Sequence, residues 1–367
     1  MRTSPVRPNV MNSRPALSDT RQAATHFRTQ SPKTLLKALY AKAIWRYFGP
    51  YAASICPWID DPEGCALRSP LRLLREKQNP NKDQRYMKNK EKPTPHASDS
   101  LKLDAKKTLS QLEEFLSRKL EESGFNGYII GLSGGIDTSV AAAIAVRAVG
   151  AARVQSICMP YKAAQTQAAR DARLVATWLG IKHAEVELWR VIDAYYSNIK
   201  AINPVRTGNK MARERMAILF DQAFDARLLV LGATNRSEMA LGYATWFGET
   251  ACSINLLGQL YKTQVRQLAV ELGVPEKIRV KPPSADLWLG HTDEDELGIT
   301  FDELDKFLSM VIDQGIVSRD KLKKAGFSDL TIDRTLAVSH KFYFKRRCPE
   351  TADLGLPDIP DNITLKK

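Results

Sequence analysis

Short apolar runs alternate with longer amphipathic stretches from about Leu101 onward. The apolar runs predict buried strands, and the stretches with apolar residues three and four positions apart predict helices. Strands are expected at residues 128–132, 154–159 and 228–231, with a weaker one at 184–186. Helices are expected at residues 101–122, 137–149, 165–179, 189–202, 211–224, 263–272, 302–313 and 331–343.

This order of elements predicts an α/β fold. Strands separated by helices imply crossover connections, and therefore a doubly wound, mostly parallel sheet with helices on both faces. Ligands of such sheets bind beyond the carboxyl ends of the strands. Functional residues are therefore expected just after the predicted strands.

The first hundred residues follow a different pattern. Residues 1–30 are rich in Arg, Ser, Thr, Asn and Pro, a composition that does not form a packed core. One amphipathic helix is predicted at 31–48, with Ser31 as its cap and Pro32 in its first turn. Three regions are expected: a basic, largely disordered extension at 1–98, a folded α/β domain at 99–355 and a C-terminal tail at 356–367.

The net charge is concentrated in this extension. Of the net charge of +13, +10 belongs to residues 1–100, which hold 18 Lys and Arg against 8 Asp and Glu. The remaining +3 is typical of an ordinary soluble domain and gives no reason to expect nucleic-acid binding. The extension is compatible with a loosely docked segment, an organelle-targeting segment or a basic helix that binds a membrane or nucleic acid.

Cysteine spacing and hydropathy further narrow the class of protein. The five cysteines are Cys56, Cys65, Cys158, Cys252 and Cys348, and they form no CxxC pair. This argues against a zinc module or a disulfide framework, and it favours a reducing, cytoplasmic environment. No apolar run approaches the ~20 residues that a membrane-spanning helix needs.

The strongest local signal is the segment Gly-Leu-Ser-Gly-Gly-Ile-Asp-Thr-Ser at 131–139, between a predicted strand and a predicted helix. Glycines let the backbone amides approach an anion, and the helix N-terminus adds unpaired N–H groups. Ser133, Thr138 and Ser139 add hydroxyl donors. Asp137 is unfavourable beside a bare phosphate unless a divalent cation lies between them, so it predicts Mg²⁺. The Walker A and GxGxxG patterns are absent, and a plain glycine turn capping a helix is the alternative interpretation.

The segment Ser-Gly-Gly-Ile-Asp-Thr-Ser at 133–139 resembles the pyrophosphate loop of the N-type ATP pyrophosphatase superfamily, whose members activate substrates by adenylation. Later segments are similar to those of ammonia-dependent NAD synthetases, in the same order. These are residues 208–216, 231–238, 260–265, 281–288 and 292–298. The resemblance covers about residues 101–350 and implies an adenine nucleotide alpha hydrolase-like fold.

The resemblance implies a two-step ligase reaction. The nicotinate carboxylate of deamido-NAD attacks the α-phosphorus of ATP and releases pyrophosphate, and ammonia then displaces AMP to leave NAD. Neither step needs a protein nucleophile, which agrees with the scattered His and Cys residues of this chain. Only about 100 residues precede the synthetase region, fewer than the roughly 250 of an added amidase domain, so free ammonia is expected as the nitrogen donor. A homodimer with deamido-NAD near the subunit boundary is also implied.

The resemblance also implies roles for individual residues. Asp137, Glu238 and Lys262 match the catalytic positions, and the two acids match the Mg²⁺ ligands. The ATP-binding positions are Gly131, Ser133, Gly134, Gly135, Asp137, Thr138, Ser139, Thr234, Lys262 and Ser284. The deamido-NAD positions are Arg215, Glu249 and a C-terminal pair, either His340 and Lys341 or Phe344 and Lys345. Trp288, Met211 and Met216 are expected in the core.

The chain departs from the family pattern at several positions. Glu249 stands where the family has an aspartate, Gln259 replaces an acid and His291 replaces a glutamine. Two alternatives stay open. The shared loop and the basic N-terminal residues suggest a tRNA-modifying adenylating enzyme of the same superfamily, and the departures suggest a degenerate synthetase without catalysis. The small net charge of residues 101–367 and the isolated cysteines argue against the first. The intact loop with Asp137, Glu238 and Lys262 argues against the second.

Overall fold

The computed structural model describes residues 101–162, 166–199, 203–284, 292–352 and 354. The chain divides into two units, Met1–Glu91 and Lys92–Lys367, and the described residues all belong to the second. The predicted helix at 31–48, the predicted extension and tail, Trp288 and His291 lie outside the described residues. The domain boundaries proposed from the sequence stay predictions.

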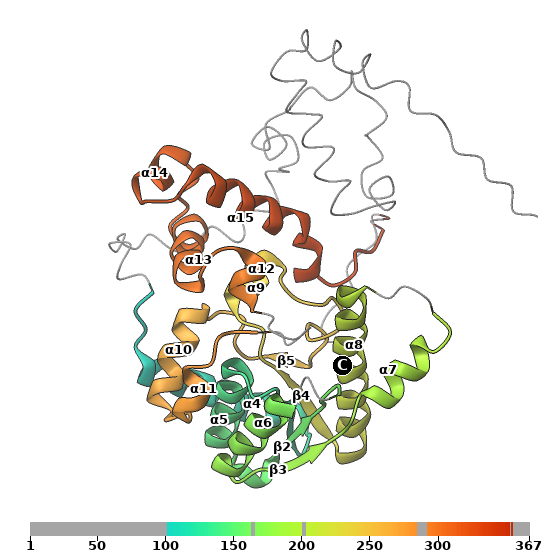
Figure 1. Cartoon of the computed structure of the whole chain (residues 1–367). Helices are drawn as coiled ribbons and strands as arrows, with labels where there is room; N and C mark the ends of the chain where they lie inside the picture. The colour runs from blue at the N-terminus through green and yellow to red at the C-terminus, as the bar shows by residue number, and fades with distance from the viewer. Residues whose placement is uncertain (1–100, 163–165, 200–202, 285–291, 353, 355–367) are drawn as a thin grey trace, which may run out of the picture. The chain divides into compact units, whose positions relative to one another are not determined.

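Five parallel strands form the centre of this unit (Figure 1). They are β1 (Gly127–Gly131), β2 (Val154–Cys158), β3 (Lys182–Glu185), β4 (Leu228–Gly232) and β5 (Ile254–Asn255), in the order β3-β2-β1-β4-β5. The register pairs Ile129 with Gln155 on one side and with Val230 on the other. The predicted parallel sheet is confirmed. The sequence reading missed β5 because two residues are too few to show a period.

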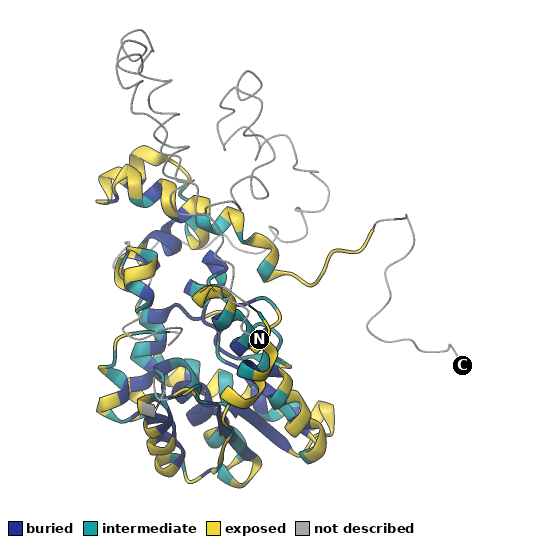
Figure 2. Cartoon of the chain, turned by 45° about the vertical axis from the view of Figure 1, so that its right-hand side comes forward, coloured by how far each residue is buried: buried dark blue, intermediate teal, exposed yellow. Residues whose placement is uncertain are grey.

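Helices cover both faces of the sheet. On one face, α4 (Ala105–Ser123), α5 (Ile136–Val149), α6 (Thr166–Leu179), α10 (Lys262–Glu271) and α11 (Glu276–Arg279) share a core with Tyr128 and Ile130. On the other, α7 (Trp189–Tyr196) and α8 (Pro204–Ala226) pack on Ile129. Successive residues of β1 therefore point to opposite cores, which is why the strand is apolar throughout. Figure 2 shows the strands as a buried layer between partly exposed helices.

A further group of helices lies beyond the carboxyl ends of the strands (Figure 1). It comprises α9 (Arg236–Leu241), α12 (Asp293–Leu297), α13 (Phe301–Leu308), the π-helical turn η6 (Ser309–Asp313), α14 (Arg319–Lys324), α15 (Asp329–Lys341) and the short turn η7 (Tyr343–Arg346). Phe301, Phe307 and Ile332 belong to its separate hydrophobic core. This layer brings residues from late in the chain to the edge of the sheet where ligands are expected.

The helices predicted within the described residues are present, but several boundaries were wrong. The helix predicted at 101–122 begins at Ala105, and the α-helix predicted at 302–313 ends at Leu308 and continues as η6. The helix predicted at 211–224 begins at Pro204, because Asn203 caps it by accepting a hydrogen bond from the Val205 amide and proline suits the first turn. The helix predicted at 189–202 ends at Tyr196. Met211 and Met216 are buried, as predicted. Among the described residues, none of the helices has the length and apolar character of a membrane span.

Candidate active site at the carboxyl ends of β1 and β4

The candidate site lies where the strand order changes direction. The chain runs from β1 outward through β2 to β3, and then returns to place β4 on the other side of β1. The glycine loop follows β1, and the segment Thr234–Glu238 follows β4. Because the two strands are parallel neighbours, both segments emerge at the same edge of the sheet, which is the usual ligand position in this class of fold.

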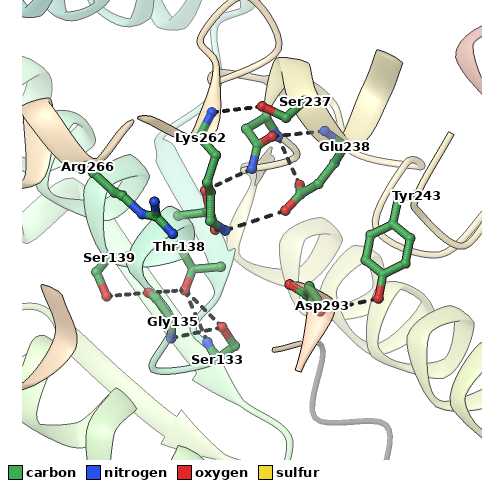
Figure 3. Close-up of polar contacts among 12 residues, drawn as sticks. Ser133, Gly135, Thr138, Ser139, Ser237, Glu238, Tyr243, Lys262, Arg266 and Asp293 are labelled. Atoms are coloured by element: carbon green, nitrogen blue, oxygen red, sulfur yellow. Dashed lines mark hydrogen bonds and ion pairs between the residues drawn. The ribbon is translucent and has the colours of Figure 1, made fainter. Parts of the chain in front are cut away.

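The loop after β1 has the backbone of an anion-binding turn. Gly134 adopts φ +74°, and a Cβ atom there would lie 2.6 Å from Cβ of Asp171 and 2.7 Å from the Ala168 carbonyl oxygen. Only glycine satisfies both the positive φ and this close approach to α6. The Ser133 hydroxyl accepts a hydrogen bond from the Gly135 amide at 3.2 Å and lies 3.1 Å from Oγ1 of Thr138. These contacts are drawn in Figure 3.

Ser133 and Ser139 differ in their access to solvent. Ser133 is exposed at the mouth of the loop. Ser139 is fully buried, and its hydroxyl donates to the Gly135 carbonyl oxygen at 2.7 Å. In this structure the Ser139 side chain therefore stabilises the loop through its hydrogen bond to the Gly135 carbonyl oxygen. Its predicted contact with ATP stays a prediction, as do those of the other loop residues.

The segment after β4 begins α9 with a capping box. The Asn235 side-chain oxygen accepts from the Glu238 amide at 3.0 Å, and the Glu238 carboxylate accepts from the Asn235 amide at 3.1 Å. The side-chain amide of Asn235 also donates to Oδ1 of Asp137 at 3.1 Å. Asn235 is completely buried and connects the two loops. No local sequence pattern predicts this role of Asn235, because its contact with Asp137 exists only in the folded chain.

Lys262, the first residue of α10, joins the two predicted acids. Its Nζ atom lies 2.5 Å from Oδ2 of Asp137 and 3.6 Å from Oε1 of Glu238. The Lys262 side chain is only 3% exposed, and those of Asp137 and Glu238 are 18% and 16% exposed. The structure thus brings together all three residues predicted to be catalytic, from three separate segments. Figure 3 labels Glu238 and Lys262 in this cluster.

The charges in this cluster influence one another strongly. Burial raises the pKa of Glu238 to about 8, opposed by the nearby Lys262 ammonium. Burial alone would lower the pKa of Lys262, but Asp137 and Glu238 outweigh it and raise that pKa. The lysine is therefore held as a cation, and it is the counter-charge of the two acids.

A third carboxylate lies next to this cluster. Asp293 is 5% exposed and accepts a hydrogen bond from the Tyr243 hydroxyl at 3.3 Å, while the same hydroxyl lies 2.5 Å from Glu296. Its negative charge contributes to the raised pKa of both Glu238 and Lys262. The sequence reading quoted the segment that contains Asp293 but named no role for it. Asp293 begins the short helix α12, so it does not follow a predicted strand as Asp137 and Glu238 do.

Two predicted hydroxyl groups flank the cluster. Thr234 is 7% exposed and lies two residues after the end of β4, next to the Asn235 cap. Ser284 is partly exposed and follows Pro283, whose carbonyl oxygen accepts from the Asp293 amide at 3.0 Å. Both positions are at the ligand edge of the sheet, and their contact with ATP stays a prediction.

The residues predicted to contact deamido-NAD gather around the turn at 244–249. Glu249 is exposed, and its carboxylate accepts from the Thr245 amide at 2.6 Å. Thr245 donates its hydroxyl to Oδ1 of Asn209 on α8 at 2.8 Å. Arg215, also on α8, donates to the Met159 carbonyl oxygen at 3.2 Å, close enough to Glu249 to act on its charge.

The two candidate C-terminal pairs occupy different positions. Lys345 donates to the Ala244 carbonyl oxygen at 2.6 Å, and the Phe344 ring packs edge-on against Trp246 at 5.1 Å between centroids. His340 and Lys341 are exposed at the end of α15. The structure therefore places Phe344 and Lys345 against the same turn as Glu249. Neither pair is tested as a substrate contact.

The chain is similar to proteins of one family. Residues 108–349 match the family model described as NAD synthase. The NH(3)-dependent NAD(+) synthetase of Trichlorobacter lovleyi is 40% identical over 255 residues, which are 70% of this chain and 93% of the relative. The protein of the same description from Fusobacterium nucleatum is 39% identical over 254 residues, 69% of this chain and 98% of the relative.

Two solved structures resemble the fold over a similar range. The NMN synthetase from Francisella tularensis has a TM-score of 0.62 at 32% identity, covering 69% of this chain and 100% of that one. The NH3-dependent NAD synthetase from Campylobacter jejuni, in complex with the nitrate ion, has a TM-score of 0.59 at 27% identity, covering 68% of this chain and 100% of that one.

Proposed function

The chain belongs to the NAD synthase family, and we propose that it amidates deamido-NAD to NAD, with ATP and ammonia, at the edge formed by β1 and β4. The observation that carries this proposal is the convergence of Asp137, Glu238 and Lys262 beside the glycine loop. An anion-binding loop, a cation and two acids are the groups that an adenylating site requires, because ATP carries the charge to be neutralised.

The two acids suit a magnesium ion. Both carboxylates reach one cation, the Lys262 ammonium, so their oxygens converge on a common point. Two carboxylates are a donor set that suits Mg²⁺, which is usually bound by one or two carboxylates together with substrate phosphates. When bound, the ion would neutralise the phosphates and make the α-phosphorus more electrophilic.

The protein's own groups have binding and orienting roles. The amides of the glycine loop and the first turn of α5 bind the phosphate chain, with Ser133 and Thr138 as hydroxyl donors at its mouth. Lys262 neutralises negative charge that accumulates on the phosphates as pyrophosphate leaves. The nicotinate carboxylate is itself the nucleophile, so the site has to hold it in line and exclude water. Ammonia then attacks the activated acyl carbon and AMP departs.

The turn at 244–249 is proposed to hold the second substrate. Arg215, Lys345 and the exposed Glu249 place two cations and an acid around this turn, while Trp246 and Phe344 provide aromatic surface. Cations suit the dinucleotide phosphates, and aromatic rings suit its bases. In the packing seen here Phe344 and Lys345 contact this turn, so we favour them over His340 and Lys341 as the substrate pair.

One relative raises a second candidate substrate. The Francisella tularensis protein, which is 32% identical and fully covered, is described as an NMN synthetase. The acid precursor of a mononucleotide carries the same nicotinate carboxylate, so the same adenylation chemistry would serve it. The two candidate substrates, deamido-NAD and the mononucleotide acid, are compared by measuring kcat/KM for each. The ratio of the two values measures how strongly the enzyme discriminates between them.

We also propose that the chain acts as a homodimer in the cytoplasm. The support is a set of large apolar side chains exposed on α7 and α8, among which Phe224 is 87% exposed and Tyr195 is 53% exposed. Large apolar side chains exposed to this degree suit an interface between proteins. The free, unpaired cysteines of the described residues agree with a reducing compartment.

The function is tested by supplying the purified chain with deamido-NAD, ATP, Mg²⁺ and ammonium and detecting NAD by mass spectrometry. Parallel reactions replace deamido-NAD with the mononucleotide acid or with tRNA. NAD formation with release of AMP and pyrophosphate supports the proposal. Pyrophosphate release that depends on tRNA instead would overturn it.

A further inference from the structure

The N-termini of α9 and α10 are bonded to each other. The Arg236 amide donates to the Leu260 carbonyl oxygen at 2.8 Å, and the Lys262 amide donates to the Ser237 hydroxyl at 2.9 Å. Glu238 and Lys262 each lie within one residue of these contacts. The relative position of the acid and the cation is therefore set by backbone contacts as well as by their own attraction.

A buried carboxylate on a third helix completes this connection. Asp305, on α13, is 0% exposed. Its Oδ1 atom accepts from the Ser237 hydroxyl at 2.5 Å, and its Oδ2 atom accepts from the Thr263 amide at 2.8 Å. Asp305 thus bonds the second amide of α10 directly and reaches the first amide, that of Lys262, through Ser237.

The surroundings of Asp305 show that these hydrogen bonds offset the cost of burying its carboxylate. A fully buried carboxylate is costly unless hydrogen bonds or a cation compensate for lost hydration. Among the described residues no ion pair joins Asp305 to a lysine or arginine, and the positive charge that acts on its pKa is that of Arg266. A carboxylate that accepts bonds at a helix N-terminus is also favoured by the unpaired amides and the helix dipole.

We propose that Asp305 is a positioning residue, which fixes the first turn of α10 and so holds the Lys262 ammonium against Asp137 and Glu238. This inference rests on the proposed function, in which Lys262 acts on the ATP phosphates. Asp305 does not touch those groups itself. Its loss leaves the Thr263 amide without its acceptor. It also frees the Ser237 hydroxyl, which accepts from the Lys262 amide, to rotate, so that the turn carrying Lys262 shifts.

The test compares four variants of the full-length protein: Asp305→Asn, Asp305→Ala, Ser237→Ala and the double variant that combines Asp305→Ala with Ser237→Ala. Each is assayed with ATP, Mg²⁺, deamido-NAD and ammonium. A displacement of about 1 Å at a reacting group costs on the order of 10²-fold in rate. We therefore expect Asp305→Ala to lower kcat by about 100-fold, with Asp305→Asn and Ser237→Ala intermediate and KM for deamido-NAD within about threefold of wild type. The double variant should be no slower than Asp305→Ala, because both substitutions interrupt one chain of bonds.

The matched control is Thr300→Ala. Thr300 is exposed and caps α13, the helix that carries Asp305. Its hydroxyl accepts a hydrogen bond from the Glu303 amide at 3.3 Å. Its loss should lower the melting temperature and leave kcat unchanged, which separates destabilisation of α13 from displacement of Lys262. If Asp305→Ala does not fold, Asp305→Asn and Ser237→Ala carry the test.

The outcomes distinguish the two proposals. If wild type forms NAD while Asp305→Asn and Ser237→Ala keep its kcat, the role of Asp305 is overturned and the proposed function stands. Losses that multiply in the double variant also overturn it, because they would show separate effects. If wild type forms no NAD at all, the proposed function fails, and the role of Asp305 fails with it.

Discussion

Asn235 donates its side-chain amide to Asp137 at 3.1 Å, although 98 positions separate the two residues in the chain. The bond crosses from the segment after β4 to the loop after β1. The other end of the same side chain caps α9 and so holds Glu238. One buried amide therefore sets the position of both proposed metal ligands.

Replacement of Asn235 by alanine should impair both stability and activity. The loss of the cap and of a buried hydrogen bond is expected to lower the free energy of unfolding by about 1–3 kcal/mol. The rate should fall as well, because Asp137 and Glu238 are no longer held together. Urea unfolding and kcat give the two readings. Asn203→Ala is the control, since Asn203 caps α8 at the Val205 amide and should affect stability alone. Equal kcat in the two variants would contradict this role.

Replacement of Asp137 by asparagine should nearly abolish pyrophosphate release while preserving the fold. The amide keeps the shape of the side chain but removes the charge that faces Lys262 and the proposed Mg²⁺. A loss on the order of 10³-fold is expected for removal of one group that stabilises transition-state charge. Circular dichroism checks the fold, and a pyrophosphate assay measures the rate. Normal turnover by this variant would show that the magnesium assignment is wrong.

Replacement of Lys262 by methionine should destabilise the protein and make Mg²⁺ more effective as a stabiliser. The substitution leaves two poorly hydrated acids facing each other, which is expected to cost about 3 kcal/mol. In wild type a metal ion competes with the ammonium for these acids, whereas in the variant it does not. Thermal unfolding with and without Mg²⁺ should therefore show a larger rise in melting temperature for the variant. An equal rise in both proteins would indicate that the ion binds elsewhere.

Acid should weaken the sheet edge at His183. Burial lowers the pKa of this residue, which is 12% exposed on β3 with Nδ1 lying 2.8 Å from the Ser156 hydroxyl. Its folded pKa is below the ordinary value, so the neutral ring contributes stability above pH 6.5 that is lost as pH falls through the folded pKa. Urea unfolding above and below this pH should show a smaller acid effect in His183→Gln than in wild type. His340→Gln, on the exposed end of α15, should retain the wild-type effect. Indistinguishable pH dependence of stability in all three proteins would contradict the assignment of this acid effect to His183.

The sequence was sufficient for the sheet and for Asp137, whereas Glu238 was identified through the family resemblance. The strands β1 and β4 are apolar runs of about strand length, and Asp137 and Glu238 come shortly after them. Local periodicity and strand ends are properties of neighbouring residues, so they can be read from the chain directly. The two-residue strand β5 and the early start of α8 at Pro204 have weaker local signals and were missed or misplaced.

The contacts that organise the site could not be predicted in the same way. Lys262 was identified through family resemblance, and its approach to Asp137 requires α10 to pack beside α5. Asn235 and Asp305 received no role, because a buried side chain is recognised by the partners it meets, and those partners come from distant segments. Such residues lack a local pattern, since their spacing reflects tertiary packing alone.

The most direct test of the account follows isotopically labelled ammonium into NAD, with AMP and pyrophosphate measured in the same reaction. Wild type should form labelled NAD together with equal amounts of AMP and pyrophosphate, and Asp137→Asn should form almost none of the three. Release of ADP and phosphate by wild type, or undiminished labelled NAD from Asp137→Asn, would contradict adenylation at the loop between β1 and α5.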